Sequence, residues 1–256
     1  LYSTEMSSAL CSIDRVSASA NMNNRLSEAI VEAYKSTNGA PISFELMLKC
    51  YQSRMKDANN DDSISSVLKQ LVNAHIFESE DKVSLIDDSY IIKMDGYPKD
   101  GPIAKAIVYF LMSKLNNIYE LLDKQAVNDE VVQIRHFSII DEAHYMLDFD
   151  NRPLRNLIAV GRNKGLSIIL ATQNMSSFKS KGFDFYANAQ YPLIMKQQTI
   201  DDKVIKDLFG VSGQELQEIR TAIAGLQKGE LIIKDQMAFA LGMGNKYKKI
   251  NVTHLI

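Results

Sequence analysis

Two pairs of polar residues stand directly after short apolar runs, which is where a strand-bound site is expected. The run 136–140 ends in Asp141 and Glu142, and the run 166–171 ends in Thr172 and Gln173. Because ligands of a parallel sheet bind beyond the carboxyl ends of its strands, the residues that follow each strand are candidate site residues. We therefore expect the two carboxylates and the amide to face one shared crevice.

These side-chain types suit the hydrolysis of a nucleoside triphosphate. That reaction needs an acid to hold the water shell of Mg²⁺, a group that orients the attacking water, and a polar sensor near the terminal phosphate. A buried apolar strand followed by Asp-Glu meets the requirement of a Walker B element. A solvated turn is the alternative for Asp141 and Glu142 alone, and the second strand ending in Ala171-Thr172-Gln173 argues against it.

The order of apolar runs and helical patterns predicts an α/β fold from residue 84 onward. The expected strands are 89–94, 134–140, 166–171, 191–195 and 231–233, and a long helix begins at Pro102. Residues 1–83 instead have helical patterns, with helices around 26–33, over 44–55 and from the Asp61-Asp62 pair to His75. We expect a helical insertion or subdomain over 1–83 and an α/β domain over 84–256, with a helix-turn-helix unit as the alternative for the first part.

Composition and charge exclude several classes of protein. Hydrophobic residues make up 46% of the chain, which is ample for a core. The 29 Lys and Arg residues are balanced by 31 Asp and Glu residues, so the protein has no overall positive field that would attract nucleic acid. Any contact with nucleic acid must therefore be local. No apolar run approaches the roughly 18 to 20 residues that cross a bilayer. We expect a cytoplasmic protein that does not contact membranes.

Three segments together resemble a known family. FSIIDEAHYML, GRNKGLSIILATQ and YPLIMKQQ are similar to the carboxyl-terminal half of the HerA and FtsK class of hexameric DNA-pumping ATPases. In that class a buried strand ends in Asp-Glu-Ala-His, a Gly-Arg precedes a further Gly, and the next strand ends in Gln. The resemblance covers about residues 84–234, and the subgroup it suggests is the HerA-type ATPase of phosphorothioation-dependent DNA restriction.

The resemblance implies a RecA-like, mostly parallel sheet flanked by helices, and a role for each matching residue. Asp141 would organise the water ligands of Mg²⁺, Glu142 would polarise the attacking water, and Gln173 would sense the γ-phosphate of ATP. Thr172 would contact the nucleotide beside Gln173. Arg162 matches the arginine that such hexamers insert into the neighbouring subunit's site to stabilise transition-state charge, and an ordinary surface arginine is the alternative.

One part of the ATPase pattern does not occur in this sequence. A Walker A loop needs Gly-x-x-x-x-Gly-Lys-Ser/Thr, because backbone N–H groups and the Lys hold the β and γ phosphates. The sequence contains no Gly-Lys dipeptide. The family order places that loop upstream of Leu1, so we interpret the chain as the carboxyl-terminal part of a longer ATPase. It would lack the P-loop strand and be inactive alone, while the whole enzyme would couple hydrolysis of ATP with Mg²⁺ to DNA translocation or helicase-like work.

Two loops that carry lysines are candidate DNA contacts. The resemblance implies loops that project into a central pore, where Lys and Arg touch phosphates without reading bases. Lys99 follows the first expected strand, and Lys179 and Lys181 follow the strand that ends at Gln173. Solvated surface lysines are the alternative for each. The implied partners are DNA, further copies of the chain in a hexamer, and nuclease or restriction subunits.

Two other functions fit parts of the sequence. A non-catalytic assembly module would keep the fold and use it to bind partner subunits, but it has no physical need for the set of Asp141, Glu142, Arg162 and Gln173. A DEAH-box RNA helicase shares four letters, yet Ala171-Thr172-Gln173 stands where such helicases carry Ser-Ala-Thr. His144 reads as a structural residue, because no second His or Cys lies at ligand spacing for a metal.

Overall fold

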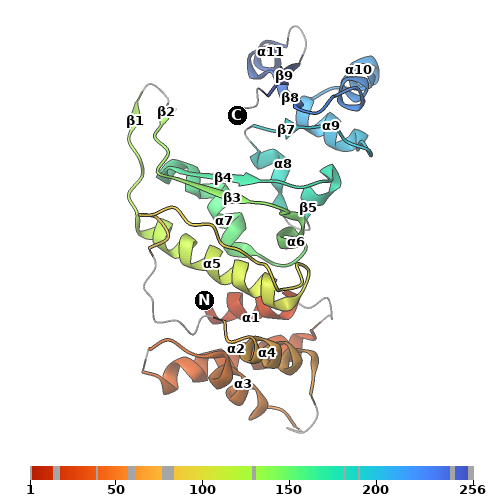
Figure 1. Cartoon of the computed structure of the whole chain (residues 1–256). Coiled ribbons are helices and arrows are strands. Elements are labelled where there is room, and N and C mark those ends of the chain that lie inside the picture. Colours follow the sequence, from red (N-terminus) through yellow and green to blue (C-terminus); the bar gives the residue numbers. More distant parts are fainter. Residues whose placement is uncertain are drawn as a thin grey trace. The chain divides into compact units, whose positions relative to one another are not determined.

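The chain forms two compact units (Figure 1). The computed structural model describes residues 2–13, 18–38, 40–56, 61–76, 84–128, 131–180, 183–189, 191–242 and 246–252. Unit 1 comprises Leu1–Ile139 and Tyr145–Ile169, and unit 2 comprises Ile140–His144 and Leu170–Ile256. The predicted subdomain boundary at residue 83 stays a prediction. No helix among the described residues is long and apolar enough to span a bilayer.

Four helices form the first part of unit 1, and consecutive helices pack against one another (Figure 1). They are α1 (Tyr2–Ile13), α2 (Ala20–Ser36), α3 (Phe44–Gln52) and α4 (Ser63–Asn73). Apolar residues spaced three and four positions apart bury one face of a helix, as Leu26, Ile30 and Ala33 do on α2. The three helices predicted in this segment are confirmed.

Asp62 joins three of these helices. At the start of α4 its carboxylate accepts the N–H of Ser65 at 2.9 Å, and the Ser65 hydroxyl accepts the N–H of Asp62 at 2.9 Å, a capping box. The same carboxylate accepts the hydroxyl of Tyr51 on α3 at 2.6 Å and pairs with Arg25 on α2 at 3.3 Å. Burial, followed by the hydrogen bond to Asp62, raises the pKa of Tyr51. One side chain therefore starts a helix and fixes two others to it.

The second part of unit 1 is a short parallel strand pair with helices on one face. The elements are α5 (Pro102–Leu121), β3 (His136–Ile140), α6 (His144–Leu147), α7 (Arg152–Val160), the 3₁₀ helix η1 (Gly161–Lys164) and β4 (Leu166–Leu170). β3 pairs with β4, and α5 packs on α7. Leu115 and Tyr119 of α5, Leu157 of α7 and Leu166 of β4 form their shared core. Lys164 donates to the last carbonyls of α5, those of Tyr119 at 2.6 Å and Glu120 at 2.9 Å.

Two expectations for this part are wrong. Residues 89–94 do not form a strand, although their composition favours one, and Ile91 is 89% exposed. A strand needs a neighbouring backbone to bond, and composition alone does not supply it. The strand 136–140 is not buried on both faces: Phe137 is 58% and Ile139 is 69% exposed. The helices cover the alternate face of β3, on which His136, Ser138 and Ile140 are partly buried.

Unit 2 is built on an antiparallel sheet of β7 (Leu193–Ile194), β8 (Glu230–Lys234) and β9 (Tyr247–Asn251), in that order. Ile194 and Ile232 lie opposite each other and share a core with α9 (Asp202–Phe209) and α10 (Gly213–Ala224). The strands predicted at 191–195 and 231–233 are confirmed in place, and they run antiparallel.

The remaining described elements of the chain are short. They are β1 (Val127–Asn128), β2 (Val131–Val132), η2 (Met175–Phe178), β5 (Lys179–Ser180), β6 (Phe183–Asp184), α8 (Phe185–Asn188) and α11 (Gln236–Leu241).

A buried lysine holds three segments of unit 1 together. The side chain of Lys105 on α5 is 1% exposed, and its Nζ lies 3.1 Å from the carboxylate of Asp148, which follows α6. Nζ also donates to the carbonyl of Ile13 at the end of α1 at 3.4 Å and lies 5.9 Å from the centre of the Phe149 ring. Because a buried ammonium needs a counter-charge, we expect the unit's stability to depend on Asp148.

The two halves of this ion pair should differ in cost. Asp148→Asn leaves the ammonium buried without a counter-charge, and should lower the free energy of unfolding by about 3 to 5 kcal/mol. Lys105→Met should cost only about 1 to 2 kcal/mol, because an apolar chain fills the space and the Asp148 carboxylate, 33% exposed, remains hydrated. Urea unfolding measures both, with Glu45→Gln in the exposed pair with Lys49 as the control. A larger loss in Lys105→Met than in Asp148→Asn would contradict this account.

Candidate functional site

The backbone pairing of β3 and β4 continues past the ends of both strands. The N–H of Ala171 donates to the carbonyl of Ile140 at 3.0 Å, and the N–H of Ala143 donates to the carbonyl of Ala171 at 2.7 Å. These two bonds lie within unit 2. They hold the turn after β3 against the segment after β4, so the two pairs of polar residues lie side by side as the strand order predicted.

Glu142 has an unusual backbone conformation at this turn. Its φ is +50°, in the left-handed region that residues other than glycine rarely adopt. Such a conformation costs on the order of 1 to 3 kcal/mol and persists where the surroundings hold it. Its N–H donates to the Asp141 carboxylate at 2.9 Å, and the next residue, Ala143, is fully buried and bonded to Ala171. The turn is therefore fixed on both sides of Glu142.

The predicted acid and amide are in direct contact. Nε2 of Gln173 donates to Oε1 of Glu142 at 2.7 Å, although the two residues lie 31 positions apart in the chain. The Glu142 side chain is 25% exposed, and Asp141 and Gln173 are exposed residues. A carboxylate beside an amide donor is able to orient a water molecule next to an anionic oxygen. The structure brings Asp141, Glu142 and Gln173 together, and their catalytic roles stay predictions.

His144 and Thr172 complete the cluster. Nδ1 of His144 lies 3.3 Å from Oε2 of Glu142 and 3.4 Å from Oγ1 of Thr172. Oε2 is buried and has no hydrogen-bond partner. Nδ1 of His144 is close to it, but the two atoms are not aligned as a hydrogen bond requires. Sequence reasoning treated His144 as structural and missed its contact with Glu142. The spacing gave no signal, because the left-handed turn at Glu142 breaks any regular periodicity.

The other predicted site residues lie elsewhere. Arg162 is exposed on η1 in unit 1, whereas Glu142 belongs to unit 2, and its role as a trans-acting arginine stays a prediction. Lys99 is exposed before α5. Lys179 begins β5, which pairs with β6. The Lys179 side chain and the whole of Lys181 lie outside the described residues.

The donor set fits Mg²⁺ held largely by water. No cluster of three or more His, Cys, Asp or Glu side chains able to grip a metal occurs in the described ranges. Mg²⁺ in phosphoryl-transfer sites keeps several waters and uses one or two carboxylates together with phosphate oxygens. Exposed Asp141 matches that requirement. It would hold the water shell of the ion only with the phosphates in place.

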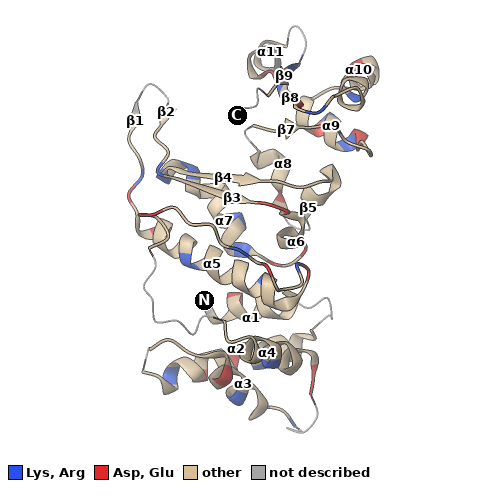
Figure 2. Ribbon diagram, viewed as in Figure 1, with Lys and Arg blue, Asp and Glu red and all other residues tan. Residues whose placement is uncertain are grey.

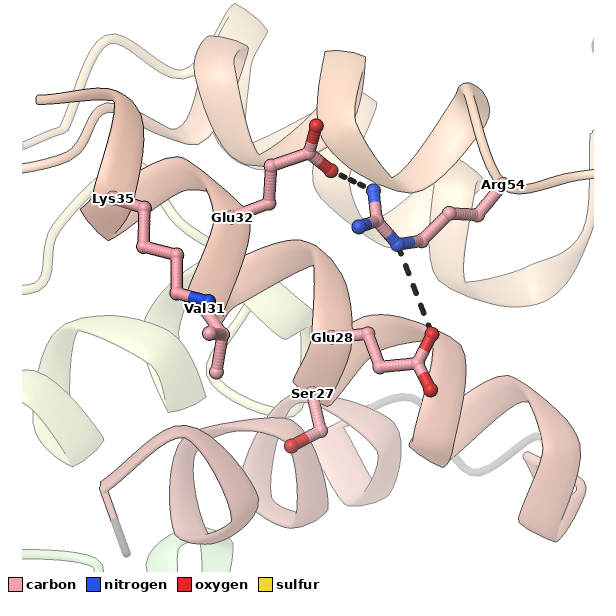
Figure 3. A pocket seen from close by; sticks show the side chains of 6 residues that line it. All are labelled: Ser27, Glu28, Val31, Glu32, Lys35 and Arg54. Atoms are coloured by element: carbon pink, nitrogen blue, oxygen red, sulfur yellow. Dashed lines mark hydrogen bonds and ion pairs between the residues drawn. The ribbon is translucent and has the colours of Figure 1, made fainter.

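Two hollows are lined by residues outside this cluster. One, of about 400 Å³, lies on α2, where Arg54 pairs with Glu28 at 3.8 Å and with Glu32, as Figure 3 shows. Arg54, Glu28 and Glu32 form ion pairs with one another, so none of these three charges is free to bind a ligand. The other, of about 540 Å³, lies over the sheet of unit 2 between Leu193, Ile233 and Ile250. Neither of these two hollows is lined by Glu142 or Gln173.

Comparison with known proteins found similarity at the level of the fold. No family model matches the sequence, and no curated protein matches it. Among solved structures, VirB4 of Thermoanaerobacter pseudethanolicus is similar with a TM-score of 0.61 and 15% sequence identity, over 99% of this chain and 69% of that chain. At this identity the similarity shows the fold alone: the chain shares an α/β fold with part of that structure, with a short parallel strand pair flanked by helices as in a RecA-like fold.

Proposed function

We propose that this chain carries the hydrolytic residues of an ATP-driven motor ATPase of the P-loop class. The observation that carries the proposal is the 2.7 Å hydrogen bond between Gln173 and Glu142 at the carboxyl end of a parallel strand pair. ATPases of that class need an acid and a phosphate sensor at such a strand end. The fold shared with VirB4, a P-loop ATPase, supports the same class.

The arrangement suggests how the residues share the reaction. With ATP and Mg²⁺ bound, Asp141 would hold waters of the Mg²⁺ shell, Glu142 would orient the attacking water, and Thr172 would contact the nucleotide. Gln173 now donates to Glu142. When its amide turns to a γ-phosphate oxygen, the carboxylate is released to accept from water. Arg162 of a neighbouring copy neutralises charge in the transition state. The sequence has no Gly-Lys dipeptide, so the proposal assigns the grip on the phosphates to a Gly-Lys-Ser/Thr loop that is not among these 256 residues.

The finer part of the proposal is a cytoplasmic DNA translocase or helicase of the HerA and FtsK type, assembled as a hexamer and acting with restriction or nuclease subunits. Its support is the sequence resemblance over residues 84–234. Acidic and basic residues are interspersed over the described ribbon, as Figure 2 shows, and the net charge is −2. DNA contact is therefore assigned to the local lysines Lys99, Lys179 and Lys181.

One observation favours the assembly module as a second candidate. The sheet of unit 2 exposes apolar side chains on the face away from α9 and α10, with Leu193 60% exposed beside the 540 Å³ hollow. Met237, which also lines that hollow, is 74% exposed. Apolar patches of this kind are typical of protein interfaces. A subunit contact there is compatible with a motor, since ring ATPases work as assemblies.

Hydrolysis should depend on the Glu142 carboxylate. In a form of the protein that contains this chain and its phosphate-binding loop, Glu142→Gln should lower kcat for ATP by about 10² to 10⁴, the usual worth of a positioned general base. KM for ATP should change little, because the amide keeps the size and shape of the side chain. Steady-state release of phosphate measures both. Glu218→Gln, on the exposed face of α10, is the matched control, and an equally active Glu142→Gln would reject the proposal.

DNA contact by the loop after Gln173 has its own test. If Lys179 and Lys181 each neutralise one phosphate, changing both to Gln should reduce the slope of log affinity against log salt by about 2. The control is Lys203→Gln with Lys206→Gln on α9, which removes the same charge from an exposed helix. Titration of a labelled duplex at several salt concentrations gives the slopes. A slope that stays unchanged in the first pair, or falls equally in the control, removes these lysines as contacts.

A further inference from the structure

The 3₁₀ turn η1 is bonded to the end of α5 and to the segment that follows it. Nζ of Lys164 donates to the final carbonyls of α5, those of Tyr119 at 2.6 Å and Glu120 at 2.9 Å. A cation at this end of a helix also interacts favourably with the helix dipole. The carbonyl of Asn163 accepts the N–H of Gln125 at 2.9 Å. A side chain and the backbone therefore both tie η1 to its neighbours in unit 1.

Glycines at both ends of η1 lie where neighbouring atoms leave no room for a side chain. A Cβ on Gly161 would lie 2.9 Å from a methyl carbon of Leu166. A Cβ on Gly165 would lie 2.7 Å from the carbonyl oxygen of Gln133. Gly165 also has a φ of +81°, which residues other than glycine rarely adopt. Its carbonyl accepts the N–H of Arg135 at 2.7 Å. The turn is therefore packed closely at both ends.

These constraints surround two exposed residues. Gly161 is buried and Lys164 is partly buried. Arg162 and Asn163, between them, are exposed. Surface turns are commonly mobile, and this one is bonded and packed on both sides. A side chain that acts on another molecule needs such a fixed backbone, because small displacements of a catalytic group lower the rate strongly.

We propose that Lys164 is a positioning residue, which holds the backbone of η1 where Arg162 reaches the nucleotide site of a second copy of the chain. Lys164 acts through Arg162 and not on ATP, so its removal should matter only while Arg162 is present. The step that involves Arg162 rests on the proposed function, whereas the anchoring of η1 by Lys164 does not.

Hydrogen exchange tests the anchoring on this chain without nucleotide. In Lys164→Met the amides of Gly165 and Gln125 should exchange at least about tenfold faster, because the loss of two charge-assisted bonds favours local opening. Lys164→Arg should restore slow exchange, since a guanidinium donates to the same carbonyls. Lys124→Met, at an exposed lysine after α5, is the matched control. Unchanged exchange of both amides in Lys164→Met overturns the proposal.

A double-mutant cycle tests the consequence in the form that contains the phosphate-binding loop. Lys164→Met should lower kcat for ATP about 10- to 100-fold, as a displacement of about 1 Å does for a catalytic group, with KM within about twofold. In an Arg162→Ala background the same change should have no further effect on kcat. A fall by the same factor in both backgrounds would show a purely structural role and overturn the proposal. Lys164→Gln, a milder change, replaces Lys164→Met if that variant does not fold.

Mixed assemblies test the action on a second copy. Subunits with Glu142→Gln keep η1 intact, and subunits with Lys164→Met keep Glu142. A mixture therefore forms sites in which one copy supplies Glu142 and its neighbour supplies Arg162. With random head-to-tail assembly of equal amounts, half times half, or about a quarter, of the sites are complete. Recovery of about a quarter of the wild-type activity supports the proposal, and no recovery overturns it.

Failure of the proposed function and failure of this inference are distinguishable. If Glu142→Gln is fully active, the proposed function is wrong, and the exchange result still decides the anchoring of η1. If Glu142→Gln is inactive while Arg162→Ala is as active as the wild type, the function stands and the positioning role of Lys164 is wrong.

Discussion

The candidate site depends on a backbone pairing that continues beyond two strands. The bond from the Ala143 N–H to the Ala171 carbonyl ties the turn after β3 to the segment after β4. It holds Glu142 at a φ of +50°, a conformation that an unconstrained chain would leave. With that turn fixed, Glu142 meets Gln173 and His144, residues from different elements. Polar side chains far apart in the sequence become neighbours because the backbone beneath them is bonded.

Under the proposed function, the same geometry assigns these residues to one part of an ATP site. Two carboxylates, an amide, a hydroxyl and an imidazole are suited to orienting water and Mg²⁺. They are poorly suited to gripping a triphosphate, since Asp141 and Glu142 repel it until Mg²⁺ compensates the charge. A phosphate cradle needs backbone N–H groups and a lysine. Under the proposed function, the chain would therefore supply the residues for hydrolysis, and a separate phosphate-binding loop would hold the triphosphate.

Much of this arrangement could be predicted from the sequence, and the exceptions share a cause. The convergence of Glu142 and Gln173 followed from the rule that parallel strands present their final residues at one edge. Helix α4 followed from its start at Asp62. The strand predicted at 89–94 does not form, because strand formation depends on a neighbouring backbone. Apolar runs also do not reveal that β7 and β8 are antiparallel. The contact of His144 with Glu142 was not predicted, because Glu142 adopts a left-handed conformation that changes the chain direction, and the periodicity of the sequence does not reveal such a conformation.

The central claim is that Asp141, Glu142 and Gln173 form the hydrolytic side of an ATP site. The most direct measurement is a structure of the protein, together with its phosphate-binding loop, in the presence of Mg²⁺ and a non-hydrolysable ATP analogue. The account predicts that Gln173 leaves Glu142 for a γ-phosphate oxygen, that Asp141 joins the water shell of Mg²⁺, and that Glu142 faces an in-line water. A γ-phosphate bound away from the ends of β3 and β4 would contradict it.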